Sequence, residues 1–374
     1  MTVNNCVVSG LFESYRDSNG STIIDLSGGF GFQVPEIIDA VIRQADLMGL
    51  SNRVLVSEPL INLCTTIATL LPDPLDNSYV CNSGDEAFEG ALKLCKGLHP
   101  KRKTIVYLEG GDYGSLSYGR CMGAPDLYQE MTRFLGLRLK PIKTPDDLST
   151  VDWSDCFAVC HTYLHYDAAG KLGLPSDGTL ECMYRQARGA DVPIVGMDAD
   201  TCMGSLGTMF GYQRVGRAPD IVVIGGSLGG GAVPIGMYTC PEAMAYRVYG
   251  RSTPAKHGST TAGNPLACIA ALAVLEYAQR TDTPQRCISN GQLVANALCR
   301  LGARSIGSVV SVPVEDRTVL QGIQQRLLSQ GLYIPEPVGP ELVLRLPITA
   351  RPEVLMRAIT VVRETMSNVI NFAA

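Results

Sequence analysis

The sequence predicts an α/β protein in which a large domain with a mostly parallel sheet is accompanied by a smaller α+β domain. At 374 residues, the chain is long enough for two domains that each bury a core of their own. Short apolar runs alternate with segments of helical periodicity, an order typical of a sheet covered by helices. Several of the runs end in glycine-rich or polar segments, where open α/β sheets place their ligands.

The composition excludes several classes of protein. Hydrophobic residues make up 46% of the chain and the net charge is −5, while the start of the chain lacks the pattern of a signal peptide. No apolar stretch reaches the roughly 18 residues of a membrane span. The 13 cysteines form no Cys-x-x-Cys pair, so we expect a reducing, cytoplasmic setting. Basic residues are scattered, which argues against nucleic-acid binding.

The N-terminal elements come in the order strand, glycine loop, helix. Residues 23–26 form a short apolar run, and the glycine-rich segment 27–32 follows it. Apolar residues recur with helical spacing in 35–42 and again in 59–71. These segments predict one strand and two helices.

The next strand, residues 79–81, leads into a helix start of distinctive sequence. Ser83 and Glu86 have the spacing of a capping box, with Gly84 and Asp85 between them. The unpaired N–H groups and partial positive charge of a helix N-terminus attract anions. Asp85 places a carboxylate at this point, and first-turn acids are also common for helix stability alone.

Three further strands end in residues of chemical interest. The strands are predicted at residues 103–108, 157–160 and 192–197. They are followed by Asp112 and Tyr113, by His161 and His165, and by Asp198 and Asp200. Imidazole titrates near neutral pH, so either histidine is a candidate general base. A hydrogen-bonded core histidine and a structural tyrosine are the competing interpretations.

The strand at residues 221–224 ends in the richest glycine loop of the chain. The loop reads Gly-Gly-Ser-Leu-Gly-Gly-Gly over residues 225–231. Lys256 and Thr260 lie in a later polar segment, 251–265, which precedes a helix at 266–279. The C-terminal third then alternates helices with strands, of which 309–313 and 342–346 are the clearest.

Taken together, these motifs resemble the class III (ornithine/GABA-type) aminotransferases, which have the pyridoxal-phosphate (PLP) fold type I. The matching segments are the loop at 225–231, Asn-Ser-Gly-Asp-Glu-Ala at 82–87 and His-Gly-Ser-Thr-Thr-Ala-Gly-Asn-Pro at 257–265. The resemblance spans roughly residues 20 to 366. It implies a seven-stranded sheet and three parts: an N-terminal segment, the large domain and the C-terminal small domain, at residues 1–44, 45–265 and 266–374.

The resemblance also implies roles for individual residues. Gly84 and Asp85 match the phosphate site of the family, and Asp112 or Tyr113 matches the aromatic residue that stacks on the pyridine ring. The aspartate that pairs with the pyridine nitrogen matches Asp198, although counting back from the Gly204–Phe210 motif lands one residue earlier. Thr260 matches a threonine that reaches the phosphate of the partner subunit, which implies a homodimer.

The Schiff-base lysine of the family matches Gly226. Asp85 in addition sets a carboxylate beside the phosphate position, and two like charges ~4 Å apart repel by roughly 4 kcal/mol at an effective dielectric of about 20. Lys256 is the one lysine near cofactor-facing sequence, as a weak candidate for the imine or as a cation for an acidic ligand. From these departures we expect a protein that uses no cofactor and cannot carry out lysine-dependent transamination.

Three functions remain open from the sequence. The first is a repurposed, PLP-independent enzyme that acts on a small amino- or keto-acid derivative in the dimer cleft. Its candidate catalytic residues are His161, His165, Asp198, Lys256 and Tyr113, with Asp200 and Cys202 as further groups. The second is a non-catalytic partner of an active aminotransferase. The third is an enzyme that holds PLP or pyridoxamine phosphate non-covalently. A metal held by His161, His165 and the Asp198/Asp200 pair is a minor variant of the first.

Overall fold

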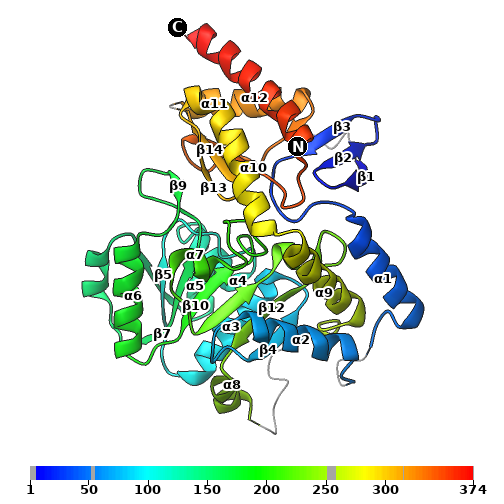
Figure 1. Cartoon of the computed structure of the whole chain (residues 1–374). Coiled ribbons are helices and arrows are strands. Elements are labelled where there is room, and N and C mark those ends of the chain that lie inside the picture. The colour runs from blue at the N-terminus through cyan, green and yellow to red at the C-terminus, as the bar shows by residue number, and fades with distance from the viewer. Residues whose placement is uncertain (1–5, 52–54, 251–257, 315, 374) are drawn as a thin grey trace.

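The structure of the chain, a computed structural model, describes residues 6–51, 55–250, 258–314 and 316–373. Figure 1 shows a large lower part built on one sheet and a smaller upper part that holds the C-terminus. Among the described residues, none of the helices combines the length and the apolar character that a membrane span requires.

A seven-stranded sheet forms the centre of the large part, in the order β4-β12-β11-β10-β7-β5-β6. Only β12 runs against its neighbours, β11 and β4, so the predicted mostly parallel sheet is confirmed. The strands are β4 (Asn77–Cys81), β5 (Thr104–Leu108), β6 (Arg138–Ile142), β7 (Cys156–Thr162), β10 (Ile194–Asp198), β11 (Ile221–Ile224) and β12 (Gly236–Cys240).

Helices cover both faces of this sheet, because its central strands are apolar on both sides. In β11, Val222 and Ile224 pack into one core with the first two helices and α9, whereas Ile221 and Val223 pack against α3 on the other face. A third core lies between α6 and strands β5, β7 and β10. The helices are α1 (Pro35–Leu47), α2 (Glu58–Leu70), α3 (Gly84–Leu98), α6 (Asp177–Gly189), α8 (Glu242–Tyr249) and α9 (Pro265–Arg280).

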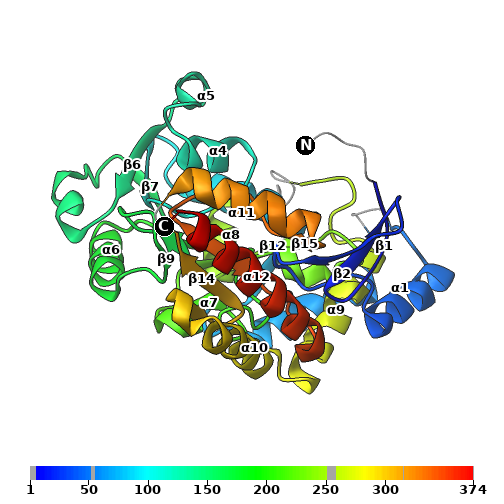
Figure 2. The same ribbon diagram turned by 90° about the horizontal axis from the view of Figure 1, so that it is seen from above.

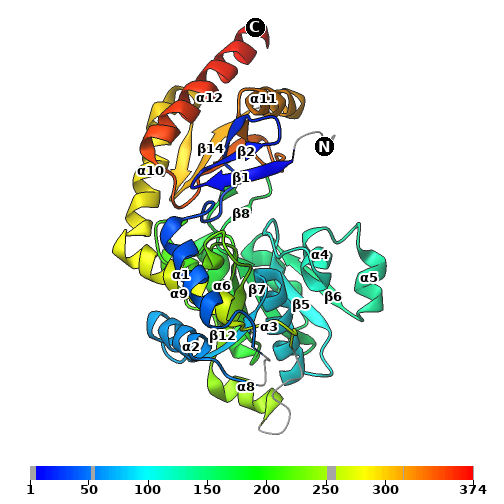
Figure 3. The ribbon, with the colours of Figure 1, turned by 90° about the vertical axis from the view of Figure 1, so that its right-hand side faces the viewer.

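The smaller part joins the two ends of the chain. Strand β3 (Thr22–Asp25) pairs in parallel with β15 (Leu332–Tyr333), so the N-terminal strands β1 (Val7–Leu11) and β2 (Ser14–Asp17) share a sheet with C-terminal sequence. Figure 3 shows these strands beside the C-terminal helices. A second sheet and three helices complete it: β13 (Arg304–Ile306), β14 (Val309–Pro313), β16 (Glu341–Arg345), α10 (Thr283–Ala297), α11 (Arg317–Ser329) and α12 (Pro352–Ala373). The predicted division points at residues 45 and 266 stay predictions.

Several short elements connect the main ones. Helices α4 and α5 lie beside the β6 edge of the sheet, as Figure 2 shows. A hairpin of β8 and β9 rises from the end of β7 toward the small part (Figure 1). These elements are α4 (Ser117–Gly123), α5 (Gln129–Phe134), η1 (Pro145–Thr150), β8 (His165–Tyr166), β9 (Leu172–Gly173), α7 (Gly211–Val215), η2 (Gly226–Gly229) and η3 (Cys299–Leu301).

Candidate functional site

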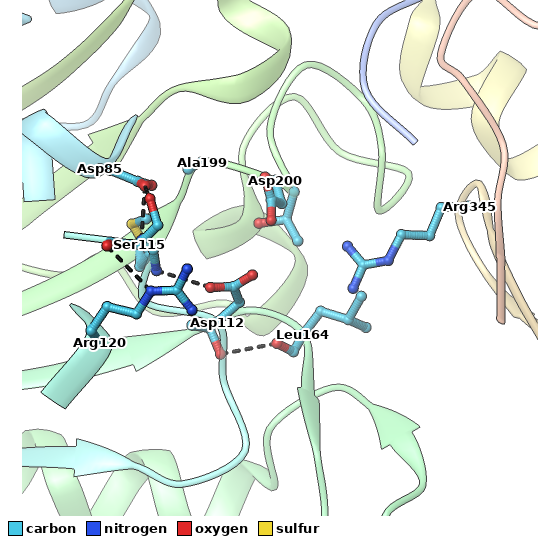
Figure 4. Close-up of a pocket in the computed structure, with 12 residues that line it drawn as sticks. Asp85, Asp112, Ser115, Arg120, Leu164, Ala199, Asp200 and Arg345 are labelled. Carbon is cyan, nitrogen blue, oxygen red and sulfur yellow. Dashed lines mark hydrogen bonds between the residues drawn. The ribbon is translucent and has the colours of Figure 1, made fainter. Parts of the chain in front are cut away.

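A cavity of about 290 Å³ opens at the carboxyl ends of β5, β7 and β10, where the start of α3 and strand β16 meet them. This is the sheet edge at which parallel α/β proteins bind their ligands. Figure 4 shows that its polar side chains converge from separate elements. The lining consists of Asp85, Asp112, Gly114, Ser115, Arg120, Thr162, Leu164, Met197, Ala199, Asp200, Thr201 and Arg345.

The start of α3 has the predicted capping box. Ser83 Oγ accepts a hydrogen bond from the Glu86 N–H at 3.1 Å, and Glu86 Oε2 accepts one from the Asn82 N–H at 3.0 Å. Asp85 follows this cap and turns toward the loop after β5. Its Oδ2 accepts the N–H of Ser115 at 2.8 Å and the Ser115 hydroxyl at 2.5 Å. Asp85 therefore holds this loop in place at the wall of the cavity.

Of the two residues predicted for ring stacking, Asp112 and Tyr113, only Asp112 lines the cavity. Its Oδ1 accepts the N–H of Gly114 at 2.9 Å. Tyr113 is 1% exposed and points into the core, where its hydroxyl donates to the carbonyl of Leu108 at 2.7 Å. The alternation of side chains along an extended segment separates these two neighbours. The surroundings of Tyr113 therefore agree with a structural role in the core.

At the end of β10 the side chains that line the cavity are Met197, Ala199 and Asp200, whereas Asp198 is fully buried outside it. Asp198 accepts hydrogen bonds from the Thr201 hydroxyl and, at 2.7 Å, from the Gly211 N–H. Burial raises the pKa of Asp198 to about 7, against the lowering effect of these bonds. Side chains alternate along a strand, so Met197 faces the cavity at the place that was predicted for Asp198. This is the position reached by counting back from the Gly204–Phe210 motif.

The two candidate histidines lie apart from the cavity lining. His161 is fully buried, and its Nε2 lies 2.9 Å from the Tyr184 hydroxyl on α6. Burial lowers the pKa of His161 to about 4, so it is neutral at pH 7. His165 begins β8, and its Nδ1 lies 3.1 Å from the Glu109 carbonyl oxygen. Among the described residues, no three His, Cys, Asp or Glu side chains gather to hold a metal, which leaves the metal variant without a site.

Gly226 begins η2, with only Gly225 between it and the end of β11, and its backbone has φ of +46°. A Cβ at this position would lie 2.4 Å from the carbonyl oxygen of Ala199, closer than real Cβ contacts allow. A Cβ on Gly225 would likewise meet the Cα of Gly84 at 2.4 Å. The glycine loop thus packs its backbone directly against β10 and α3, with no room for side chains at either position.

The segment that follows α8 contributes two predicted residues. Lys256 lies outside the described residues. Thr260 is exposed in a turn, and its neighbours anchor the segment to the start of α3: Ser259 Oγ lies 2.6 Å from Asn82 Nδ2, and Thr261 Oγ1 lies 2.9 Å from Asn82 Oδ1. Thr260 itself lines neither this cavity nor its outer neighbour in its own chain.

Sequence reasoning missed both arginines of the site. Arg120 comes from α4, and its Nε donates to the Ser115 carbonyl at 3.3 Å. Arg345 is the last residue of β16. Its charge within the apolar run 342–346 is the signal by which the sequence could have identified it. Both also line a neighbouring outer cavity of about 530 Å³, whose walls include α4 and residues 335–338.

Asp200 and Arg345 bring opposite charges to the cavity. The side chain of Asp200 is exposed at the wall of the cavity, and no hydrogen bond to it is found in the described part of the chain. Burial raises the pKa of Asp200, Asp112 raises it further and Arg345 opposes the rise. Arg345 lies beside the Tyr166 side chain, whose pKa it lowers, and the ion pairs of the described residues do not include it.

Comparison with known proteins places this geometry in a family. The model of the family described as aminotransferase class-III matches residues 6–146 and 182–360. Among solved structures, the ornithine aminotransferase of Toxoplasma gondii is 21% identical with a TM-score of 0.87, over 99% of this chain and 92% of that chain. The adenosylmethionine-8-amino-7-oxononanoate aminotransferase of Methanocaldococcus jannaschii is 20% identical with a TM-score of 0.85, over 98% and 94%.

The same comparison corrects the expectation that no cofactor is involved, which is wrong. An amine transaminase from an uncultivated Pseudomonas species, described in its PLP-bound internal aldimine form, is 17% identical with a TM-score of 0.86, over 98% of this chain and 95% of that chain. A second structure of the Toxoplasma gondii ornithine aminotransferase is described with partial occupancy of PLP at the active site. The expectation had rested on three local departures in the sequence, whereas the family match extends over most of the chain.

The structural likeness establishes fold type I, and the family model covers well over half of the chain. The predicted fold and family are both confirmed. This protein belongs to the class III aminotransferases.

Proposed function

We propose that this chain is a class III aminotransferase relative that acts on a small amino- or keto-acid derivative and cannot carry out ordinary lysine-dependent transamination. The observation that carries the proposal is Gly226. The family's Schiff-base lysine matches this residue, and the backbone there leaves no room for a side chain because the Ala199 carbonyl is too close. The proposal concerns how the family's coenzyme is attached, and it leaves PLP as the expected cofactor.

The residues of the site fit an imine-linked PLP poorly. No lysine is found among the described residues that line the two cavities. Asp85 presents a carboxylate at the start of α3, where an anion would otherwise meet only N–H groups. Met197, an apolar side chain without a titratable proton, occupies the cavity position that was predicted for the aspartate. These three features support a site that holds the coenzyme by other contacts than an imine to lysine.

The groups that remain suit proton transfer to or from a small ligand. Asp200 is the best candidate for an acid or base, because it lines the cavity and because desolvation and the Asp112 carboxylate raise its pKa. His161 and Tyr113 are engaged in the core and supply no such group to the cavity. Arg345 offers a guanidinium for a substrate carboxylate at the opposite wall.

Non-covalent binding is the way in which this site would hold PLP or pyridoxamine phosphate. Arg120 favours it, because its guanidinium lies at the same end of the cavity as Asp85 and can offset that negative charge near a phosphate. The chemistry would then run without an imine to the chain.

Incubation of the purified protein with PLP, followed by borohydride reduction and peptide mass spectrometry, tests the proposal. We expect no pyridoxyl-lysine on any peptide, and no amino transfer between standard amino donors and keto acceptors. An ornithine aminotransferase treated in parallel should give its lysine adduct. A reduced adduct on any lysine of this chain, Lys256 included, together with amino transfer, would overturn the proposal. Absorbance between 330 and 420 nm without an adduct is the result expected for coenzyme held non-covalently.

A further inference from the structure

Strand β1, at the outer margin of the small part (Figure 1), is an edge strand without the features that usually protect an edge. It pairs with β2 alone among the described strands, so the backbone groups on its other side have no strand to bond to. Its sequence, Val-Val-Ser-Gly-Leu, contains neither a charge nor a proline, and Val7 and Val8 are 62% and 67% exposed. By contrast, the edge strand β6 carries Arg138, Lys140 and Pro141, residue types that discourage pairing. The uncharged open edge of β1 is a template for a further strand.

A groove of about 490 Å³ opens beside this edge, and its floor includes one face of the N-terminal sheet. The floor residues form two cross-strand rows, Ser9–Arg16–Thr22 and Leu11–Ser14–Ile24. A strand added beside β1 would extend both rows, because residues opposite one another on paired strands are neighbours on the same face. Its alternate side chains would therefore point into the groove.

The start of α12 forms the other wall of the groove, which carries more positive than negative charge. Arg351 is fixed there by the buried Glu13, because its Nη2 donates to Glu13 Oε1 at 2.6 Å, and these two charges offset each other. Arg16 on the floor and Arg357 on the wall are exposed, and the ion pairs of the described residues include neither. Glu353 is the one acid among the described residues that line the groove. The groove therefore attracts carboxylates.

We propose that β1 and this groove bind an extended, acidic segment of another protein, which adds a strand to the N-terminal sheet. The main chain of the segment bonds to the open edge of β1, and its alternate side chains enter the groove. An acidic side chain beside Ser9 extends the row that contains Arg16, and an apolar side chain beside Leu11 packs on that exposed leucine. The groove thus selects the pattern acidic-x-apolar, with x on the opposite face of the sheet.

A second copy of this chain fits the site less well than an acidic partner. The β1 strand of a second copy carries only uncharged side chains, so pairing of two β1 strands would bring no carboxylate to Arg16 and Arg357. Complementary charge gives an interface its specificity, and here it favours a separate, acidic protein. The site lies apart from the coenzyme cavity, so the proposal is independent of the proposed function.

Fluorescence anisotropy with labelled peptides tests the proposal on the unmodified chain. The probe is the peptide Thr-Glu-Thr-Leu-Thr-Glu-Thr with capped ends, in which acids flank an apolar residue on one face in either direction. A second peptide has lysine in place of both glutamates. A third has proline in place of the two threonines that flank leucine, which removes two backbone donors. We expect the first peptide to bind about tenfold or more tightly than either of the others. Equal binding of the acidic peptide and either other peptide would overturn the proposal, and so would no binding of any peptide.

Four substitutions identify the contacts. Arg16→Glu and Arg357→Glu should each weaken binding of the acidic peptide by about fivefold or more, because the reversed charge repels its glutamates. Arg326→Glu, at an exposed position on α11, is the matched control and should leave binding unchanged. Leu11→Glu should weaken binding and leave the mass measured by light scattering unchanged. A change in that mass would show that β1 pairs with a second copy and would overturn the proposal. Undiminished binding to a folded Arg16→Glu protein would also contradict it.

Discussion

At the residue scale, Asp198 and His161 lie on the neighbouring strands β10 and β7, and burial perturbs the pKa of each. The pKa of Asp198 is about 7 when folded against 3.8 in its ordinary state, so the folded chain holds the extra proton between these values. The free energy of unfolding then falls as pH rises through that window. The pKa of His161 is about 4 when folded against 6.5, so its contribution rises with pH from 4 to 6.5. Between pH 4 and 6.5 the two effects oppose each other.

Single substitutions should therefore expose opposite pH dependences. In Asp198→Asn, the His161 contribution remains, and the free energy of unfolding should rise with pH from 4.5 to 6 by up to about 1.4 kcal/mol per pH unit relative to the parent. In His161→Gln, the Asp198 contribution remains and the relative slope should be negative. Urea unfolding at several pH values measures both. Parallel pH profiles for the parent and both variants would contradict the assignment of these pKa values.

The loop at Gly226 makes a second prediction at this scale. Gly226→Ala adds a Cβ at positive φ and also within 2.4 Å of the Ala199 carbonyl. Gly216→Ala is the matched control, because it has φ of +67° and nothing within 4 Å of the added Cβ. The control should cost about 1 kcal/mol from conformation alone, and Gly226→Ala should cost about 1–3 kcal/mol more. Thermal unfolding measures the difference, and equal losses would mean that the loop accepts a side chain.

At the element scale, strand β16 is fixed to the hairpin of β8 and β9 through Glu341. This side chain is 3% exposed, and its Oε2 accepts the N–H of Leu172 on β9 at 2.8 Å. Arg304 donates to both of its oxygens, at 2.9 and 3.0 Å. The same strand ends in Arg345, so the hairpin positions the guanidinium that faces the cavity.

Replacement of Glu341 should loosen that attachment. Glu341→Gln keeps the size of the side chain but removes its charge, and should lower stability by about 1–3 kcal/mol. Glu364→Gln, exposed on α12, is the control and should lie within about 0.5 kcal/mol of the parent. Differential scanning calorimetry gives the comparison. A Glu341→Gln protein as stable as its control would show that the contact contributes nothing.

The elements differ in how far the sequence predicts them. The strands that became β5, β7, β10 and β11 were found from their apolar runs, because buried parallel strands are apolar on both faces. Because both faces of such a strand are apolar, its sequence does not show which residue faces the cavity. The sequence therefore does not distinguish Met197 from Asp198 as the residue at that position. Arg345 reaches the site only through tertiary contacts between the two parts of the chain. Residues that bond within one local motif, such as Ser83 and Glu86, were predicted correctly.

At the scale of the whole molecule, apolar side chains stay exposed on and after α1. Leu47 is 82% exposed, Leu50 64%, Leu55 66% and Val56 68%. Exposed apolar patches of this kind mark contact surfaces. With Thr260 also exposed, this favours the homodimer implied by the family resemblance, in which a second copy covers these residues.

Light scattering coupled to size-exclusion chromatography should therefore give twice the 40.1 kDa mass of one chain at micromolar concentration. Leu55→Asp should shift the protein toward the monomer, because the dimer would have to bury an unpaired charge. Leu328→Asp, at a 45% exposed position on α11, is the control and should leave the mass unchanged. A monomeric parent, or a Leu55→Asp protein that remains fully dimeric, would contradict the prediction.

The contact between the Gly226 backbone and the Ala199 carbonyl also has a consequence for the design of variants. A single codon change to lysine would introduce a side chain into a turn that has closed over its place, so the product would fold less well before it gained any reactivity. A lysine at this position would therefore require the adjoining strand end to move first.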